Sequence, residues 1–226
     1  MFQSKIGLQK KKRKWYDHLK QQQIVRGSGF GMGKMFTGGK RQVPNLGRFI
    51  FLCIIMLYFI FSSNTYAYEL FGGKYRNPNS LKYWIDSSVI QAGYEARAVY
   101  GSEAFDSSSL IGTTRTYDDS QANYKWWAST RDMGSVVADC INYNVNWLGQ
   151  ATACWDCTYD KSQLRIYLPG FQKLSWVQTR ETTAHEIGHA LGLDHEDDVR
   201  AIMLSKGFLN DEYPQNDDWN GINAIY

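Results

Sequence analysis

The stretch at residues 185–195 reads HEIGHALGLDH and holds three of the chain's four histidines. Histidines four apart on a helix lie on the same face, so the imidazoles of His185 and His189 can reach one common point. Gly192 can adopt a positive φ and end that helix, which lets the chain turn back and bring His195 to the same point. The stretch therefore requires a helix followed by a turn, and it predicts a metal site with three histidine ligands.

Glu186 follows the first of these histidines directly, which puts its carboxylate where a base can act on metal-bound water. Three protein ligands leave the fourth position of a tetrahedral zinc ion open, as a catalytic site requires. The alternative is an ordinary helix with solvated or core histidines, but the added glycine and third histidine make a chance match rare. Residues 177–184 contain neither Gly nor Pro, so the helix extends upstream, with Thr179 or Thr182 as its predicted N-cap.

The first 48 residues differ in charge from the rest of the chain. They hold twelve Lys and Arg against a single acid, Asp17, whereas the remaining residues hold thirteen basic and twenty-one acidic side chains. Residues 1–48 also show no sustained apolar period, so we expect a mostly unfolded basic leader. A run such as KKKRK at residues 10–14 can bind nucleic acid or anionic lipid. The segment that follows favours the positive region of an export signal instead, and we expect no nucleic-acid partner.

An unbroken apolar run of thirteen residues occupies positions 49–61. A membrane span needs about 20 residues, whereas the core of a signal peptide needs roughly 7–15. Small residues at Thr65 and Ala67 allow cleavage before Tyr68. We therefore interpret residues 49–67 as the core and cleavage region of a signal peptide.

The long region ahead of this run leaves two alternatives open. Translation starts downstream, with Met35 as the candidate, or the apolar run at residues 49–61 is an uncleaved anchor. Cleavage predicts a secreted or periplasmic domain at residues 68–226, whereas an anchor predicts a membrane-attached one. In both cases we expect membrane contact only through this segment.

Three cysteines lie in the predicted mature part, Cys140, Cys154 and Cys157. In an exported protein they predict one disulfide with one thiol left over, which is either free or paired to another chain. All three pairings remain open at this point. A zinc knuckle on the Cys-x-x-Cys pair would need further ligands, so we disfavour it.

Apolar periodicity predicts alternating strands and helices over the second half of the chain. We expect strands at residues 81–86, 136–143 and 163–168, with strand and loop across residues 106–135. We expect helices at residues 87–105, around the histidine motif and at residues 216–226. Mixed elements in this order predict an α+β or α/β sandwich around one sheet.

Met203 lies eight residues after the last histidine of the motif. A lone methionine in an apolar turn is normally core filler, but a tight turn beneath a metal needs an apolar, adaptable side chain. We therefore expect residues 201–204 to form such a turn, with Met203 supporting the site without touching substrate.

Together these features resemble the metzincin metalloproteases, in which the pattern HExxHxxGxxH is followed by a methionine turn. The pattern is carried here by His185, Glu186, His189, Gly192, His195 and Met203. The short interval to the methionine and the ending DDWNGINAIY at residues 217–226 are similar to the matrixin branch. The similarity covers about residues 80–226 and is strong from residue 163 onward.

The resemblance implies a metzincin-like zincin domain of α+β class at residues 68–226, with a twisted, mixed five-stranded sheet and about three helices. It implies a zinc endopeptidase with one catalytic zinc on His185, His189 and His195, and with Glu186 as general base. The partner would be a protein or peptide substrate, laid as an added strand along the sheet edge, and we expect a monomer. The alternative is a non-catalytic zinc-containing module that binds a peptide or a surface. The retained Glu186 argues against that module, because binding alone would not need a base.

Several features depart from the matrixin pattern. The residues after Tyr68 leave no room for a pro-domain, and no Pro-Arg-Cys-Gly latency motif is present, so we expect activity to be restrained by other means, if at all. No further histidines exist for the second, structural zinc of animal matrixins. Leu204 and Ser205 replace the usual Tyr-Pro after the methionine, which leaves the specificity pocket unpredicted. Calcium is an alternative cofactor at acidic loops, although we interpret their carboxylates as solvated: Asp118, Asp119, Asp156 and Asp160.

Overall fold

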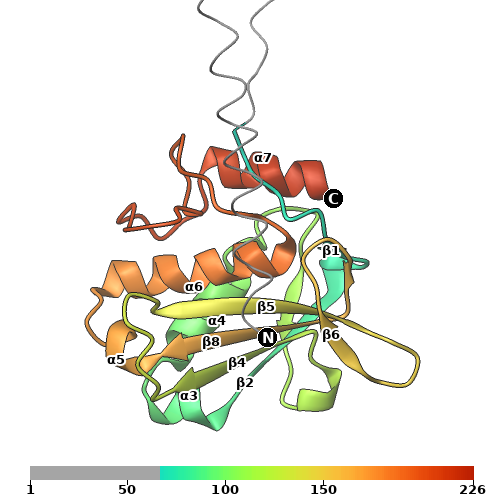
Figure 1. The fold of residues 1–226 in the computed structure, drawn as a ribbon, viewed down its shortest axis with the longest axis horizontal. Coiled ribbons are helices and arrows are strands. Elements are labelled where there is room, and N and C mark those ends of the chain that lie inside the picture. Colours follow the sequence, from blue (N-terminus) through green and yellow to red (C-terminus); the bar gives the residue numbers. More distant parts are fainter. Residues whose placement is uncertain (1–66) are drawn as a thin grey trace, which may run out of the picture. The chain divides into compact units, whose positions relative to one another are not determined.

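The computed structural model describes residues 67–226 (Figure 1). The predicted basic leader at residues 1–48 and the predicted signal core or anchor at residues 49–61 lie outside the described residues, so both stay predictions. Within residues 67–226, no helix has the length and apolar character needed to cross a membrane.

A mixed six-stranded sheet forms the centre of the domain (Figure 1). Its order is β3 (Thr113–Arg115), β2 (Leu81–Ile85), β4 (Tyr124–Ser129), β8 (Lys161–Tyr167), β5 (Ala138–Val145) and β6 (Ala151–Ala153). The first four strands run parallel to one another, whereas β5 is antiparallel to β8 and β6 is antiparallel to β5. The predicted α+β class and mixed sheet are confirmed. The sheet has six strands where we expected five, because the three-residue β6 pairs with the end of β5.

A second, smaller sheet lies within the same domain. It consists of β1 (Lys74–Tyr75) and β7 (Thr158–Tyr159), which pair in parallel. Since β1 is the first strand of the chain that the structure describes, this pairing joins the N-terminal segment of the domain to the segment that follows β6.

Five α-helices occur among the described residues: α3 (Ser87–Gln91), α4 (Glu95–Glu103), α5 (Leu168–Phe171), α6 (Trp176–Leu191) and α7 (Asn216–Ile225). Two short 3-10 helices, η2 (Pro78–Ser80) and η3 (Asp119–Gln121), complete the set. We expected about three helices, and three have nine residues or more, while α3 and α5 are single turns. The helix predicted at residues 87–105 is interrupted between α3 and α4, where Gly93 has a φ of 80° that ends the first segment.

The core lies between one face of the sheet and the helices α4 and α6. Along β8, Ser162, Leu164 and Ile166 are buried at alternate positions, as expected for a strand with one face inward. Helices α4 and α6 approach so closely that a Cβ on Gly101 would lie 2.6 Å from Thr183. Figure 1 shows α6 alongside β5 with α7 beyond it, so the helix bearing the histidines lies within the packed layers.

Cys154 and Cys157 form a disulfide in the segment between β6 and β7. Cys140 on β5 is a free thiol and is buried. One disulfide with one leftover thiol was predicted, and the fold selects one of the three pairings that the sequence left open.

Candidate metal centre

Helix α6 is started by a capping box at Ser175. The Ser175 Oγ accepts a hydrogen bond from the backbone N–H of Gln178, and the Gln178 side-chain oxygen accepts one from the backbone N–H of Ser175. The prediction of Thr179 or Thr182 as N-cap is wrong. Both residues lie inside the helix, and their hydroxyls donate to backbone carbonyls of the preceding turn.

Gly192 ends α6 as predicted, with a φ of 109°. A Cβ at this position would lie 2.4 Å from the carbonyl oxygen of Gly73, so glycine is required both for backbone conformation and for the close approach of the N-terminal segment. The chain then reverses, and the loop brings His195 next to His189.

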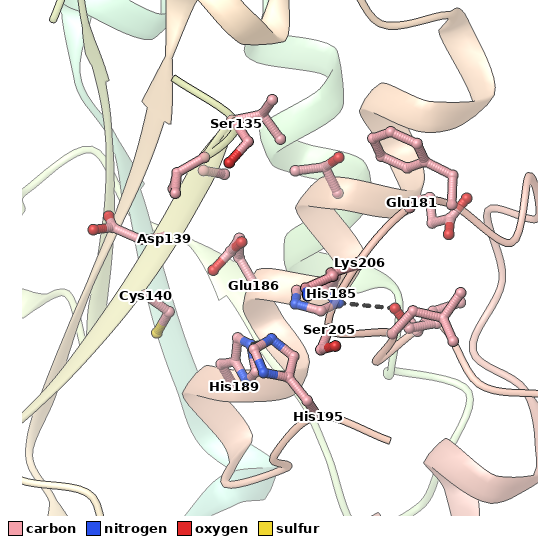
Figure 2. Close-up of a pocket in the computed structure, with 18 of the residues that line it drawn as sticks. Ser135, Asp139, Cys140, Glu181, His185, Glu186, His189, His195, Ser205 and Lys206 are labelled. Carbon is pink, nitrogen blue, oxygen red and sulfur yellow. Dashed lines mark hydrogen bonds between the residues drawn. The ribbon is translucent and has the colours of Figure 1, made fainter. Parts of the chain in front are cut away.

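The three histidines converge on one point (Figure 2). The Nδ1 atom of His185 lies 2.8 Å from the carbonyl oxygen of Ile202, and that of His189 lies 2.9 Å from the carbonyl oxygen of Leu193. A carbonyl oxygen can only accept, so Nδ1 carries the proton in both rings and Nε2 keeps its lone pair. These backbone contacts therefore orient two imidazoles with their metal-binding nitrogens toward His195.

The spacing of two of these nitrogens matches that of two zinc ligands. Zinc–nitrogen bonds of about 2.0–2.1 Å at tetrahedral angles place two ligand nitrogens about 3.3 Å apart. The Nε2 atoms of His189 and His195 are 3.2 Å apart, and the ligand atoms of all three histidines lie within 4.8 Å of one another. Three nitrogen donors also match the ligand type that zinc prefers.

The protonation states of the buried rings suit metal binding. Burial of the ring, together with the nearby His195, lowers the pKa of His185 to about 4. Burial together with the two neighbouring imidazoles lowers the pKa of His189 well below its usual value. Both rings are therefore neutral near pH 7, which is the form of histidine that binds a metal.

Glu186 is buried beside the histidines, and one of its carboxylate oxygens has no hydrogen-bond partner among the described residues. Figure 2 shows its carboxylate between the histidine rings and strand β5, which carries Cys140. Burial raises the pKa of this carboxyl well above its usual value, and the more distant Asp139 adds to the effect. A cation at the histidines acts in the opposite direction, because it favours the ionised form. An orphaned buried oxygen at this place is suited to bind a water or to hold a proton.

Met203 is buried beneath α6. A Cβ on Gly188, which lies between the first two histidines, would be 2.4 Å from the Met203 Sδ, so the turn packs directly against the helix. The backbone N–H of Glu196 donates to the Met203 carbonyl at 2.8 Å. In addition, the carboxylate of Asp197 accepts from both the N–H and the hydroxyl of Ser205. The loop bearing His195 is thereby tied to the turn that carries Met203.

A cleft of about 660 Å³ runs past the histidines. Its wall includes residues before β5 and the loop after Met203: Ser135, Val136, Lys206, Gly207 and Phe208. Phe71 and Trp155 also line it. All three histidines and Glu186 lie in its wall, so the predicted site residues open onto a space that a ligand can enter.

Four residues that support or line this site were missed by the sequence analysis. Asn142 on β5 donates from Nδ2 to the carbonyl of His189, and Glu181 accepts from the backbone N–H groups of Leu209 and Asn210. Phe71 and Trp155 line the cleft. Each acts across a long separation in sequence, so no periodicity within its own segment signals its role.

The acidic loops do not form a comparable cluster. Within residues 67–226, the three histidines are the only group of three or more His, Cys, Asp or Glu side chains placed to hold one ion. The calcium alternative therefore gains no support from its predicted carboxylates, Asp118, Asp119, Asp156 and Asp160.

Comparison with known proteins identifies the family. Residues 95–226, more than half of the chain, match the sequence profile described as Matrixin. A stretch of 44 residues is 50% identical to interstitial collagenase from Equus caballus, covering 19% of this chain and only 9% of that protein. Matrixins are zinc-dependent, and the histidines, Glu186 and Met203 all lie inside the matched region. The chain belongs to the matrixin family.

Proposed function

We propose that this protein is a secreted zinc endopeptidase in which His185, His189 and His195 bind the metal and Glu186 is the general base. The family suggests a zinc endopeptidase, and one observation carries the assignment of residues. Nitrogens of three histidines lie within 4.8 Å of one another, two of them 3.2 Å apart, beside a buried carboxylate oxygen that has no partner among the described residues.

Each residue has a distinct part in this chemistry. A zinc ion held by the three histidines would supply a Lewis acid that activates water and polarises the carbonyl of the scissile bond. Glu186 takes a proton from the attacking water at its carboxylate oxygen and passes it to the leaving amine. Its burial favours this transfer, because a carboxyl with a raised pKa holds a proton more readily between the two steps. Met203 supports the floor of the site and has no part in the proton transfer.

The substrate binds along the edge of β5. One side of β5 pairs with β8 over residues 138–143, whereas β6 covers its other side only over residues 143–145. The first half of that second edge therefore has no strand partner within the described sheet, and it borders the cleft through Ala138 and Cys140. An extended peptide can pair with this edge and so bring its backbone past the histidines.

Replacement of Glu186 by glutamine tests the mechanism. Glu186→Gln keeps the size of the side chain but removes the base, so peptide cleavage should fall by about a hundredfold to ten-thousandfold, while one zinc per chain is retained. Glu95→Gln, the same substitution on α4 away from the cleft, is the matched control and should cleave like the wild type. If the wild-type protein binds zinc but cleaves no unfolded protein, or if Glu186→Gln is fully active, the proposal is wrong and a non-catalytic zinc module is favoured.

Secretion requires a separate test. Sequencing the N-terminus of the protein recovered from the medium or periplasm should show a chain that starts near Tyr68. An intact leader in the membrane fraction would contradict cleavage and favour an anchor at residues 49–61.

A further inference from the structure

The central sheet has a second face, which is turned away from the core and the histidines. Side chains alternate between the two faces along each strand: on β4, Tyr124 and Trp126 are buried in the core, whereas the residues that follow each of them are not. Figure 2 shows the Asp139 side chain on the side of β5 away from Glu186. Six side chains at such positions, none of them buried, form what we call the outer face: Trp84, Lys125, Trp127, Asp139, Gln163 and Arg165.

The strand register arranges the outer face in two neighbouring rows. The first row crosses β2, β4 and β8 and consists of Trp84, Lys125 and Gln163. The second row crosses β4, β8 and β5 and consists of Trp127, Arg165 and Asp139. Neighbouring strands lie roughly 4.8 Å apart, so the outer face extends over about 14 Å from β2 to β5. This length suits a ligand that is built from several linked units.

The two tryptophans form one apolar patch among polar side chains. The ring centroids of Trp84 and Trp127 are 6.0 Å apart, and the rings are inclined by 65°. The face of an aromatic ring is negative, so it attracts the C–H groups on the flat side of a sugar ring, which carry a small positive charge. Because the two rings are inclined to each other, they suit one polysaccharide chain better than the flat surface of a crystalline polymer.

The charges of the outer face are neutralised within the sheet and its loops. The Lys125 Nζ lies 3.0 Å from the carboxylate of Asp119, and the Arg165 guanidinium forms two hydrogen bonds with the carboxylate of Asp139. Paired cations attract a polyanion such as a nucleic acid only weakly. A protein partner is also disfavoured, because the centre of a protein interface is depleted of charged side chains, and three of the six side chains here are charged.

Hydrogen-bond donors lie beside the tryptophans. The Gln163 side-chain oxygen accepts from the Tyr143 hydroxyl at 3.2 Å, whereas its amide nitrogen has no partner among residues 67–226. Arg165 uses Nε and Nη2 to hold Asp139, which leaves its Nη1 without a partner within the same residues. Donors of this kind next to an aromatic surface can bind the hydroxyl groups of a sugar.

We propose that the outer face is a binding site for an uncharged polysaccharide chain. The rings of Trp84 and Trp127 contact the flat sides of its sugars, and Gln163 and Arg165 donate hydrogen bonds to its hydroxyl groups. The site does not depend on the proposed peptidase function. Because the histidines lie on the other side of the sheet, a glycan on the outer face leaves the cleft open.

A glycan array probed with the full chain tests this site. It carries neutral oligosaccharides of glucose, mannose, xylose and N-acetylglucosamine, with heparin and DNA as anionic probes, and calorimetry then gives the Kd for each soluble neutral glycan that binds. The wild type should bind at least one neutral glycan, with an affinity that salt hardly changes. Trp127→Ala should weaken this binding on the order of tenfold. Trp147→Ala is the matched control and should bind like the wild type, because Trp147 is 90% exposed in the turn between β5 and β6, away from the outer face.

Two conservative variants separate contact with the glycan from a loss of structure. Trp127→Phe keeps an aromatic ring and should retain most of the affinity, whereas Gln163→Leu keeps the approximate size of the side chain but should weaken binding, because it removes the amide donor. The proposal is overturned if the wild type binds no neutral glycan, if Trp127→Ala binds as tightly as the wild type, or if binding is confined to heparin or DNA and is lost at high salt. Peptide cleavage is measured separately, so failure of the glycan site is distinguishable from failure of the peptidase function.

Discussion

Asn142 joins the sheet to the helix that carries the histidines, and its replacement by alanine should destabilise the protein strongly. The side chain is fully buried. Its Nδ2 donates to the His189 carbonyl at 2.9 Å, and its Oδ1 accepts from the Ser162 hydroxyl. Ser162 in turn lies 2.6 Å from the Tyr75 hydroxyl. The network thus links β5, β8, β1 and the end of α6 through atoms that water does not reach.

The expected loss follows from the partners left behind. In Asn142→Ala the Ser162 hydroxyl loses its acceptor, and the His189 carbonyl keeps only the Gly192 N–H at 3.2 Å. A buried polar group without its partner costs about 1–3 kcal/mol, and the missing side chain also leaves a void. We therefore expect a loss of about 3 kcal/mol in the free energy of unfolding, a large share of the total for a domain of this size.

Asn144 is the matched control for this experiment. It lies two residues further along β5 and also makes two hydrogen bonds, from Nδ2 to the Thr158 carbonyl and to Asp160, but these are exposed. Water replaces exposed partners, so Asn144→Ala should cost less than about 1 kcal/mol.

Equilibrium unfolding in urea, followed by tryptophan fluorescence, measures both losses. The variants and the wild type are compared at one fixed zinc concentration, because a ligand that binds only the folded state adds to the apparent stability. If Asn142→Ala loses no more stability than Asn144→Ala, the buried network does not hold α6 to the sheet and the reasoning is refuted.

Three further predictions concern the ends of α6 and an acid beneath the Met203 turn. Gly192→Ala should lower the Tm and weaken zinc binding, because its Cβ would collide with the Gly73 carbonyl oxygen and its φ of 109° disfavours alanine; a wild-type Tm and zinc affinity would contradict this. Ser175→Ala should cost about 1 kcal/mol in chemical unfolding, since it removes the N-cap of α6, whereas Ser175→Asp should restore most of that loss; equal stabilities of all three proteins would show that the cap is unimportant. Burial raises the pKa of Asp218 from its usual 3.8 to about 6, so the folded state holds this proton more tightly than the unfolded chain does. The contribution of Asp218 to the free energy of unfolding is therefore full below about pH 4. It falls by up to about 3 kcal/mol as the pH rises from about 4 to 6. Asp218→Asn should lack this part of the pH dependence when unfolding is measured from pH 4 to pH 7, and an identical slope in both proteins would argue against the raised pKa.

Features that depend on neighbours in sequence were predicted well. The strand at residues 163–168 and the closing helix at residues 216–226 both correspond to observed elements, β8 and α7. The helix-then-turn geometry around Gly192 was also correct. The errors lie where two local signals compete: residues 87–105 have helical spacing throughout, but Gly93 adopts a positive φ there. In the same way, Ser175 and not a later threonine starts α6, because helices extend upstream until a capping partner is reached.

The sequence by itself determined that the three histidines meet, because the spacing of His185 and His189 on one helix and the glycine turn before His195 are local properties of the backbone. Only the tertiary structure decided which carbonyls orient those rings, that Glu186 keeps an oxygen without a partner among residues 67–226, and that Trp155 reaches the cleft. These outcomes depend on contacts between segments far apart in the chain. Such contacts form because burial of apolar surface brings distant segments together, and no periodicity within a single segment specifies which ones will meet.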